Sequence, residues 1–123
     1  MTGRVNHDLE VVLPVELCGS AGDTRLVGAT IDTGSNGYLT LSRALISELG
    51  LSSHGPVEAV LGNGSCVTLQ RYLGAVIWHG TQRTTVILEA EGEPLLGMAL
   101  LRGSRVTIDA QPGGTVNVEA LGA

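Results

Sequence analysis

Residues 25–41 read R-L-V-G-A-T-I-D-T-G-S-N-G-Y-L-T-L and contain the strongest fold signal in the chain. Arg25 to Ile31 is a mostly apolar run with the length of a buried strand. It leads directly into a polar, glycine-rich loop at residues 32–37, after which Tyr38 to Leu41 predicts a short second strand. The sequence therefore places a carboxylate, Asp32, at the point where a buried strand ends.

Outward from this stretch, short apolar runs separated by glycine-rich turns predict further β-strands. The expected strands are Leu9 to Leu17 (with Pro14 at an edge or a bulge), a hairpin of Pro56 to Leu61 with Ser65 to Tyr72, a pair of Gly74 to Trp78 with Thr84 to Leu88, and a terminal hairpin of Val106 to Ile108 with Val116 to Val118. Asn63-Gly64 in the first hairpin can take the positive backbone angles that a tight turn needs.

Two helices interrupt this pattern of strands. Ser42 is a favourable N-cap for the first helix, and Gly50 is suited to end it in a left-handed conformation. The segment Pro94 to Leu101 predicts a buried strand end that enters a short helix stopped by Gly103. The expected fold class is therefore mostly β, with one clear helix and one short helix.

The composition indicates one folded domain spanning residues 1–123. Hydrophobic residues make up 43% of the chain, and charged residues only 15%, compared with roughly 25% in an average soluble domain. The net charge is −5, and no basic cluster offers a surface for nucleic acid. The sequence shows neither a signal-peptide core nor an apolar run of roughly 18 residues, so we expect a cytoplasmic protein without a membrane partner.

Neither the histidines nor the cysteines form a recognisable metal-binding pattern. His7, His54 and His79 are scattered without ligand spacing. Cys18 and Cys66 are interpreted as small buried hydrophobic residues. We therefore expect no metal and no cofactor. The acidic residues Glu89, Glu91 and Glu93 are interpreted as a solvated turn.

Asp32 is the candidate catalytic residue, and two interpretations of it are open. Gly34 has no side chain, so its amide can approach the carboxylate closely, and Ser35 can add a hydroxyl donor. A carboxylate held in this way can serve as a general acid or base. The alternative is that Asp32 only organises an Asx-turn after a strand.

Two motifs and a hairpin, taken in order, resemble the retropepsin-like aspartic proteases, which are the retroviral-type enzymes and their small cellular and bacterial relatives. The first motif is A-T-I-D-T-G-S at residues 29–35, and the second is Leu95-Leu96-Gly97. Between them the glycine-containing hairpin at residues 61–65 stands where the family has its flap. The resemblance covers about Val11 to Val118 and implies a closed, Greek-key-like β domain that forms a homodimer.

The resemblance also implies a role for each matching residue of the first motif. Asp32 would be the catalytic aspartate, and Thr33 would hydrogen-bond across the dimer axis to the partner's loop. Gly34 would keep the loop close to the substrate, and Ser35 would support the outer carboxylate oxygen.

The hairpin and the second motif would complete the site. The flap residues Gly62, Asn63 and Gly64 would close over an extended peptide. Leu96 and Gly97 would support the catalytic loop. Leu95 would line a side-chain pocket. The alternative is that Leu95 to Gly97 are all ordinary core residues.

The chain contains a single Asp-Thr-Gly, whereas an aspartic protease activates water between two carboxylates. A twofold homodimer would supply one Asp32 from each subunit. The expected function is therefore peptide-bond hydrolysis by an aspartic endopeptidase acting on an extended peptide or protein. In the family the chain termini commonly build an intermolecular sheet, and here both terminal segments could equally pair within one subunit.

Two other interpretations remain open from the sequence. The first is the same dimeric fold acting as a catalytically silent binding or assembly module. The second is an unrelated all-β interaction domain that is monomeric, with Asp32 in an ordinary turn.

Overall fold

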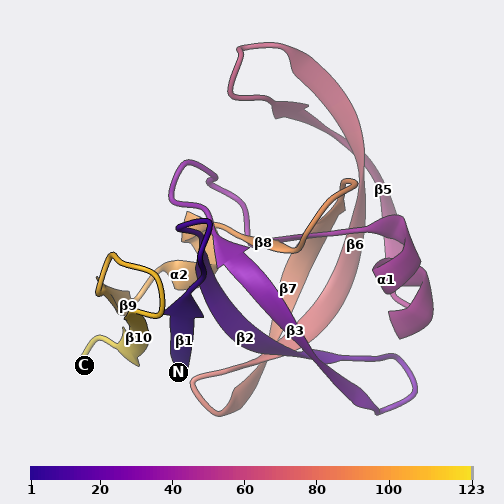
Figure 1. Cartoon of the computed structure of the whole chain (residues 1–123). Coiled ribbons are helices and arrows are strands. Elements are labelled where there is room, and N and C mark those ends of the chain that lie inside the picture. The colour runs from indigo at the N-terminus through magenta and orange to yellow at the C-terminus, as the bar shows by residue number, and fades with distance from the viewer. Residues whose placement is uncertain (123) are drawn as a thin grey trace.

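The computed structural model describes residues 1–122, and within them ten strands form one mixed sheet accompanied by two helices (Figure 1). The elements in chain order are β1 (Thr2–Val5), β2 (Val11–Cys18), β3 (Thr24–Ile31), β4 (Leu39–Leu41), α1 (Arg43–Leu49), β5 (Ser52–Val60), β6 (Cys66–Trp78), β7 (Thr81–Glu89), β8 (Leu95–Leu96), α2 (Met98–Leu101), β9 (Ser104–Ile108) and β10 (Thr115–Ala120). The prediction of a mostly β fold with one clear and one short helix is confirmed.

Six of the strands form a closed ring around the core. Starting from β2, each strand pairs with the next in the order β2, β3, β8, β4, β7 and β6, and β6 then pairs with β2. The ring closes because Leu17 on β2 lies opposite Val76 on β6. Its interior is filled by aliphatic side chains, and Trp78, 5% exposed, is the one large aromatic among the buried residues of the described chain.

Helix α1 lies beside β5 and β6 (Figure 1) and is capped as the sequence predicts. The Ser42 hydroxyl accepts a hydrogen bond from the Leu45 amide at 3.3 Å. Gly50 ends the helix with φ at 66°, a left-handed value that glycine adopts without a steric penalty. Ile46 and Leu49 are the residues of the helix that are buried against the ring.

The two chain ends pair with each other beside the ring. Strand β1, which the sequence analysis did not predict, lies between β2 and β10 in the strand order. Its four residues are too few to show a clear alternation. The terminal hairpin of β9 and β10 is confirmed, and β9 is the last strand of the sheet on this side.

Two details of the strand predictions are corrected by the structure. Strand β6 runs unbroken from Cys66 to Trp78, although two separate strands were predicted there. The chain stays extended through Gly74, where an added Cβ would lie 2.6 Å from the Ile87 side chain, so this glycine allows close packing and does not mark a turn. Leu9 lies in a turn before β2, with a positive φ of 63°.

Pro14 lies in β2 at a position where the strand behaves locally as an edge. It faces Gly28 of β3 on one side. On its other side, β2 pairs with β1 only up to Val12 and with β6 only from Glu16 onward. The missing N–H of Pro14 therefore interrupts no strand pairing, which confirms the predicted edge position.

Two predictions about polar and cysteine side chains are also corrected. Cys66 is exposed and Cys18 is only half-buried, so neither is a buried hydrophobic residue as predicted. Glu89 is the last residue of β7, and its carboxylate accepts a hydrogen bond from the Tyr72 hydroxyl at 2.8 Å, so it is not part of a solvated turn.

Neither helix of residues 1–122 is long and apolar enough to cross a bilayer.

Candidate active site

The loop that carries Asp32 connects β3 to β4, and it crosses the end of β8. β8 runs parallel to β3 and antiparallel to β4, so it lies between them. The chain leaving β3 must therefore pass over the C-terminal end of β8 to reach β4. The Asp32 amide donates to the Leu96 carbonyl at 2.8 Å, which ties the start of the loop to β8.

Three successive backbone amides just after β8 hold the rest of this loop. Gly97 donates to the Tyr38 carbonyl at 2.9 Å, Met98 to the Ser35 carbonyl at 2.8 Å, and Ala99 to the Gly37 carbonyl at 3.0 Å. Each bond joins the start of α2 to a different part of the loop. The backbone near Asp32 is thus fixed by main-chain contacts that do not depend on any side chain.

Gly97 is the residue on which the loop packs. A Cβ at this position would overlap the Gly37 carbonyl group and would lie 2.9 Å from the Ser35 Oγ. Contacts as short as this do not occur for real Cβ atoms, so only glycine fits without moving the loop. Leu96 beside it is completely buried and belongs to the core of the ring.

The Asp32 carboxylate is held at one oxygen. Its Oδ1 accepts a hydrogen bond from the Gly34 amide at 3.0 Å, and an added Cβ on Gly34 would lie 3.2 Å from the same oxygen. The Ser35 hydroxyl accepts from the Gly37 amide at 3.2 Å, and its own proton remains free to donate. Ser35 therefore stabilises the loop itself, and Thr33 lies exposed at the surface of the loop.

A long hairpin arches over this loop (Figure 1). We call residues 56–70 the arm. Within the arm β5 and β6 pair only with each other, from Pro56 opposite Gln70 to Val60 opposite Cys66. β6 joins β7 only from Arg71 onward. The arm is therefore a two-stranded ribbon, an element that is marginally stable on its own in water.

The tip of the arm is a tight turn with one left-handed residue. The Leu61 amide donates to the Ser65 carbonyl at 2.8 Å, and the Gly64 amide donates to the Leu61 carbonyl at 2.9 Å. Gly64 has φ at 85°, whereas Asn63 is not among the residues with positive φ, so one residue and not two takes this conformation. The Asn63 side chain instead accepts from the Ser65 amide at 3.0 Å.

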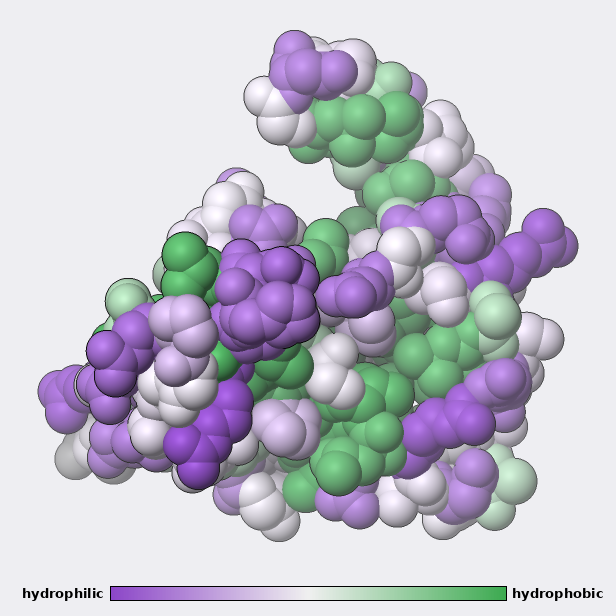
Figure 2. All heavy atoms as spheres, viewed as in Figure 1, coloured by the Kyte–Doolittle hydropathy of each residue, from purple (hydrophilic) through white to green (hydrophobic). Residues whose placement is uncertain are grey.

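A cleft of about 630 Å³ lies between the arm and the Asp32 loop. Thr40, Leu88 and Leu95 line it from the ring, and Ala59, Leu61 and Leu69 line it from the arm. Asp32 is the only ionisable side chain among the described residues that line it. Figure 2 shows this hollow from outside, with the arm separated from the body of the molecule and apolar residues along the arm.

The residues singled out in the sequence are distributed unevenly around this cleft. Asp32, Gly34, Ser35, Gly62 and Leu95 line it. The structure thus places Leu95 at the cleft and not in the ordinary core. Thr33, Asn63, Gly64, Leu96 and Gly97 are not among the lining residues. Sequence reasoning missed Thr40, Leu69 and Leu88, because each is an ordinary strand residue brought to the cleft only by strand pairing.

The base of the arm is joined to the ring by one polar side-chain contact. The Tyr72 hydroxyl donates to Glu89, and this hydrogen bond is the main cause that raises the pKa of Tyr72 above its ordinary value of 10.0. Desolvation and the negative charge of Glu89 act in the same direction, and Arg43 opposes them.

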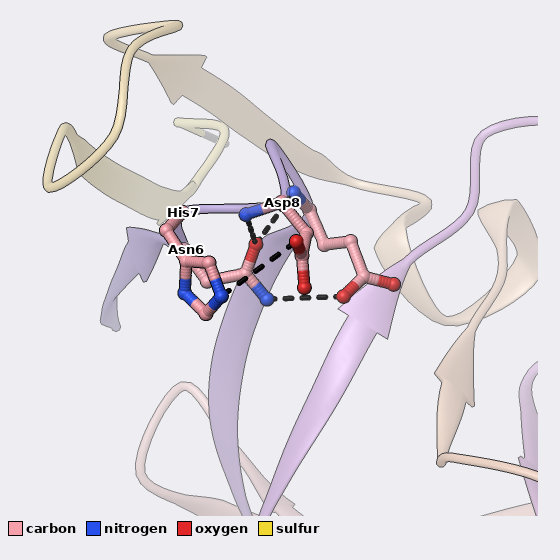
Figure 3. Close-up of polar contacts among 4 residues, drawn as sticks. Asn6, His7 and Asp8 are labelled. Carbon is pink, nitrogen blue, oxygen red and sulfur yellow. Dashed lines mark hydrogen bonds and ion pairs between the residues drawn. The ribbon is translucent and has the colours of Figure 1, made fainter.

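The turn before β2 contains a separate polar network (Figure 3). The side-chain carbonyl oxygen of Asn6 accepts hydrogen bonds from the backbone amides of Asp8 at 3.0 Å and Glu10 at 2.9 Å. The side-chain amide of Asn6 donates to the Glu10 carboxylate at 3.0 Å. His7, with its side chain 89% exposed, lies 3.6 Å from Asp8. These contacts shape the turn, and no group of residues suited to hold a metal ion occurs within residues 1–122.

Comparison of the chain with protein-family models, with curated proteins and with solved structures found no match.

Proposed function

We propose that the protein is a retropepsin-like aspartic endopeptidase that hydrolyses peptide bonds as a homodimer. The observation that carries the proposal is the position of Asp32, which among residues 1–122 is the one ionisable side chain lining a cleft beneath a two-stranded arm. A carboxylate in an otherwise uncharged cleft has no ion-pairing role there, whereas it is suited to accept a proton from water.

The chemistry requires two copies of the chain. One carboxylate can act as a base but has no acid beside it, and Asp32 is the only acidic residue at the cleft in the part of the chain that the structure describes. Two carboxylates placed close together share a single proton, because both cannot ionise easily at short range. A twofold axis near the exposed Thr33 would provide the second Asp32 without any further gene product.

In the proposed reaction the ionised Asp32 takes a proton from a water molecule, whose oxygen forms a bond to the peptide carbonyl carbon. The Asp32 of the second copy donates its proton to the carbonyl oxygen. The C–N bond then breaks as the first Asp32 gives its proton to the amine nitrogen, and the second Asp32 takes a proton back from a hydroxyl of the tetrahedral intermediate, so the pair again holds one proton. Hydrolysis consumes one water molecule and needs no covalent enzyme intermediate.

The walls of the cleft support an extended peptide with apolar side chains as the substrate. Leu61 and Leu69 from the arm face Leu88 and Leu95 from the ring, and the space between them is of ligand size. A charged substrate side chain packed against these leucines would lose its hydration without gaining a hydrogen-bond partner from them. We therefore expect cleavage between or beside aliphatic residues.

The experiment that tests this function is digestion of a mixed peptide library across roughly pH 3 to 7, with Asp32→Asn protein as the control. The proposal predicts cuts by the wild type alone, strongest on the acidic side, where the pair of carboxylates holds one proton. Equal cleavage by the Asp32→Asn protein would show that Asp32 does not perform the reaction.

A catalytically silent dimeric binding or assembly module is the second candidate. It is favoured by the Gly34 amide bond to Asp32, since an Asx-turn of this kind is sufficient structural reason for an aspartate. A statine-containing peptide, which mimics the tetrahedral intermediate, separates the two candidates. Binding that disappears in the Asp32→Asn protein supports the protease, and no binding to folded wild type supports the silent module.

A further inference from the structure

The floor of the cleft is a row of side chains from neighbouring strands. Leu95 of β8 lies opposite Thr40 of β4, and Thr40 lies opposite Leu88 of β7. The row continues to β6, where Leu88 lies opposite Arg71. Residues that pair across strands point their side chains to the same face of a sheet. Because the first three residues line the cleft, Arg71 lies on the cleft face as well, one strand beyond Leu88.

The neighbouring residues agree with this assignment of faces. Leu96, Leu39 and Ile87 form the adjacent row, and all three are buried in the core of the ring, as alternation along a strand requires. On β6, Leu69 lines the cleft and precedes Arg71 by two residues, so both side chains point to the same face. Arg71 therefore lies just past the lining of the cleft, at the base of the arm into which β6 continues (Figure 1).

The guanidinium of Arg71 has donors to spare. Nη2 donates to the His54 carbonyl at 3.0 Å, where the register of β5 shifts against β6. Within residues 1–122, Nη1 makes no hydrogen bond and is not among the buried atoms, so its two N–H groups are open to a ligand. Nε is buried without any partner.

No carboxylate of the described chain pairs with this guanidinium, since the ion pairs of residues 1–122 join other side chains. Glu89 directly follows Leu88, so its side chain points to the opposite face, where it accepts from the Tyr72 hydroxyl. Arg71 is thus a positive charge at the end of an apolar cleft, without an acid of its own chain to neutralise it.

We propose that Arg71 is a specificity-determining residue that binds a carboxylate of the peptide substrate at this end of the cleft. The inference rests on the proposed function and deepens it, because it adds one acidic group to the otherwise apolar substrate. A planar guanidinium fork matches the two oxygens of a carboxylate. The carboxylate belongs either to an aspartate or glutamate side chain or to the C-terminus of the peptide, and both present the same two oxygens.

The strand order limits the distance between this carboxylate and the cut. The order β3, β8, β4, β7, β6 separates the strand that leads into Asp32 from the strand of Arg71 by four spacings. Neighbouring strands lie about 4.8 Å apart, which gives about 19 Å across the sheet, and an extended peptide rises about 3.3 Å per residue. The carboxylate should therefore lie within about six residues of the bond that is cut.

The test is peptide binding to the Asp32→Asn protein, which requires no cleavage. The peptides carry an uncharged dye, an amidated C-terminus and an aliphatic centre, and a single glutamate is moved through about six positions on either side of that centre. Matched peptides carry glutamine instead. Fluorescence anisotropy at about pH 6, where a glutamate side chain is ionised, measures the dissociation constants. At one position or more, the glutamate peptide should bind about fivefold more tightly than its glutamine match.

Variants in the same Asp32→Asn background identify the group that binds the carboxylate. Arg71→Met should make the glutamate and glutamine peptides bind equally. Arg43→Met is the matched control, an equal change of charge on α1 beside Tyr72, and it should keep the full preference. A purely structural role of Arg71 through the His54 carbonyl would weaken both peptides alike and leave their ratio unchanged. If Arg71→Met unfolds, Arg71→Lys decides, because loss of the fork should at least halve the preference.

Glutamine peptides with a free C-terminus distinguish the two sources of the carboxylate. A preference for the free acid over the amide, lost in Arg71→Met, would identify the C-terminus. A preference confined to the amidated glutamate peptides would identify the side chain.

The outcomes separate this inference from the proposed function. Equal binding of all matched pairs, or a preference that survives Arg71→Met, would refute the carboxylate site, and cleavage by the wild type would still leave the protease proposal standing. The predicted preference without cleavage of any peptide by the wild type would support the carboxylate site and remove the protease. A folded protein that binds none of the peptides at about 1 mM would contradict the carboxylate site.

Discussion

The Asp32 loop and the arm face each other across the cleft, but they are held in opposite ways. The loop is fixed by four backbone hydrogen bonds to β8 and to the start of α2, and it packs on Gly97 without space for a methyl group. The arm's two strands pair only with each other, and pairing with the rest of the sheet begins at the base of the arm. Local stability therefore changes sharply across the cleft.

This difference suits the two tasks that the proposed reaction sets. A carboxylate that must meet a second carboxylate across a twofold axis needs a backbone that does not move. A cover over an extended peptide must instead open for entry and close for reaction. In the proposed reaction the rigid loop would carry the catalytic carboxylate, and the weakly supported arm would be the cover.

The largest expected effect is a difference in stability between two leucine variants, one beneath the Asp32 loop and one on the arm. Leu96→Ala removes a completely buried side chain beneath the loop and should lower the free energy of unfolding by about 2–5 kcal/mol. Leu61→Ala, at a residue 43% exposed on the arm, should change stability by less than about 0.5 kcal/mol but raise KM about fivefold. Urea unfolding and peptide-cleavage kinetics measure the two effects. An equal loss of stability in both variants would contradict the difference in local stability between the Asp32 loop and the arm.

A pair of glycines provides the next comparison. Gly97→Ala places a methyl group against the Gly37 carbonyl and should cost about 2–3 kcal/mol, with a loss of cleavage because the loop must shift. Gly62→Ala has no atom within 4 Å of the new methyl group and no positive φ, so its stability should match the wild type within about 0.5 kcal/mol. Urea unfolding checks both variants, and an unperturbed Gly97→Ala protein would remove the argument for a fixed loop.

The smallest effect is expected where the arm joins the ring. The raised pKa of Tyr72 means that the folded chain holds the phenolic proton more tightly than the unfolded chain. The stabilisation is therefore fully present below about pH 10 and is lost as the pH rises through the higher folded value. Tyr72→Phe and Glu89→Ala should both make the alkaline loss of stability less steep. Urea midpoints at about pH 8 and pH 11 measure the change. If stability falls between these pH values as steeply in both variants as in the wild type, the Tyr72–Glu89 hydrogen bond does not contribute to the pH dependence of stability.

The sequence predicts the parts of this molecule that depend on local signals. Asp32 at a strand end, the Ser42 cap, the Gly50 stop and the hairpins are each encoded within a few neighbouring residues. β1 was missed because a four-residue strand carries too little sequence pattern of its own and forms by pairing with β2 and β10. The unbroken course of β6 through Gly74 was missed because the glycine serves close packing and not a turn.

The candidate site divides in the same way. The Asp-Thr-Gly-Ser loop and the Leu95-Leu96-Gly97 segment stand out as motifs, but their contact depends on β8 being inserted between β3 and β4. Leu69 and Leu88 reach the cleft through strand register alone, and nothing in their sequence surroundings marks them. The exposure of Cys66 follows from its place on the arm, which pairs on one side only.

The most direct test of a shared active site is a subunit-mixing titration. Wild-type protein is held constant above its dimer dissociation constant while Asp32→Asn protein is added and the subunits are allowed to exchange. If each site needs one Asp32 from each of two chains, an equal amount of variant should lower the cleavage rate to about one half, because wild-type chains are then paired with variant chains. A cleavage rate that stays constant at every ratio, with exchange verified, would show that each chain works alone and would contradict the shared site.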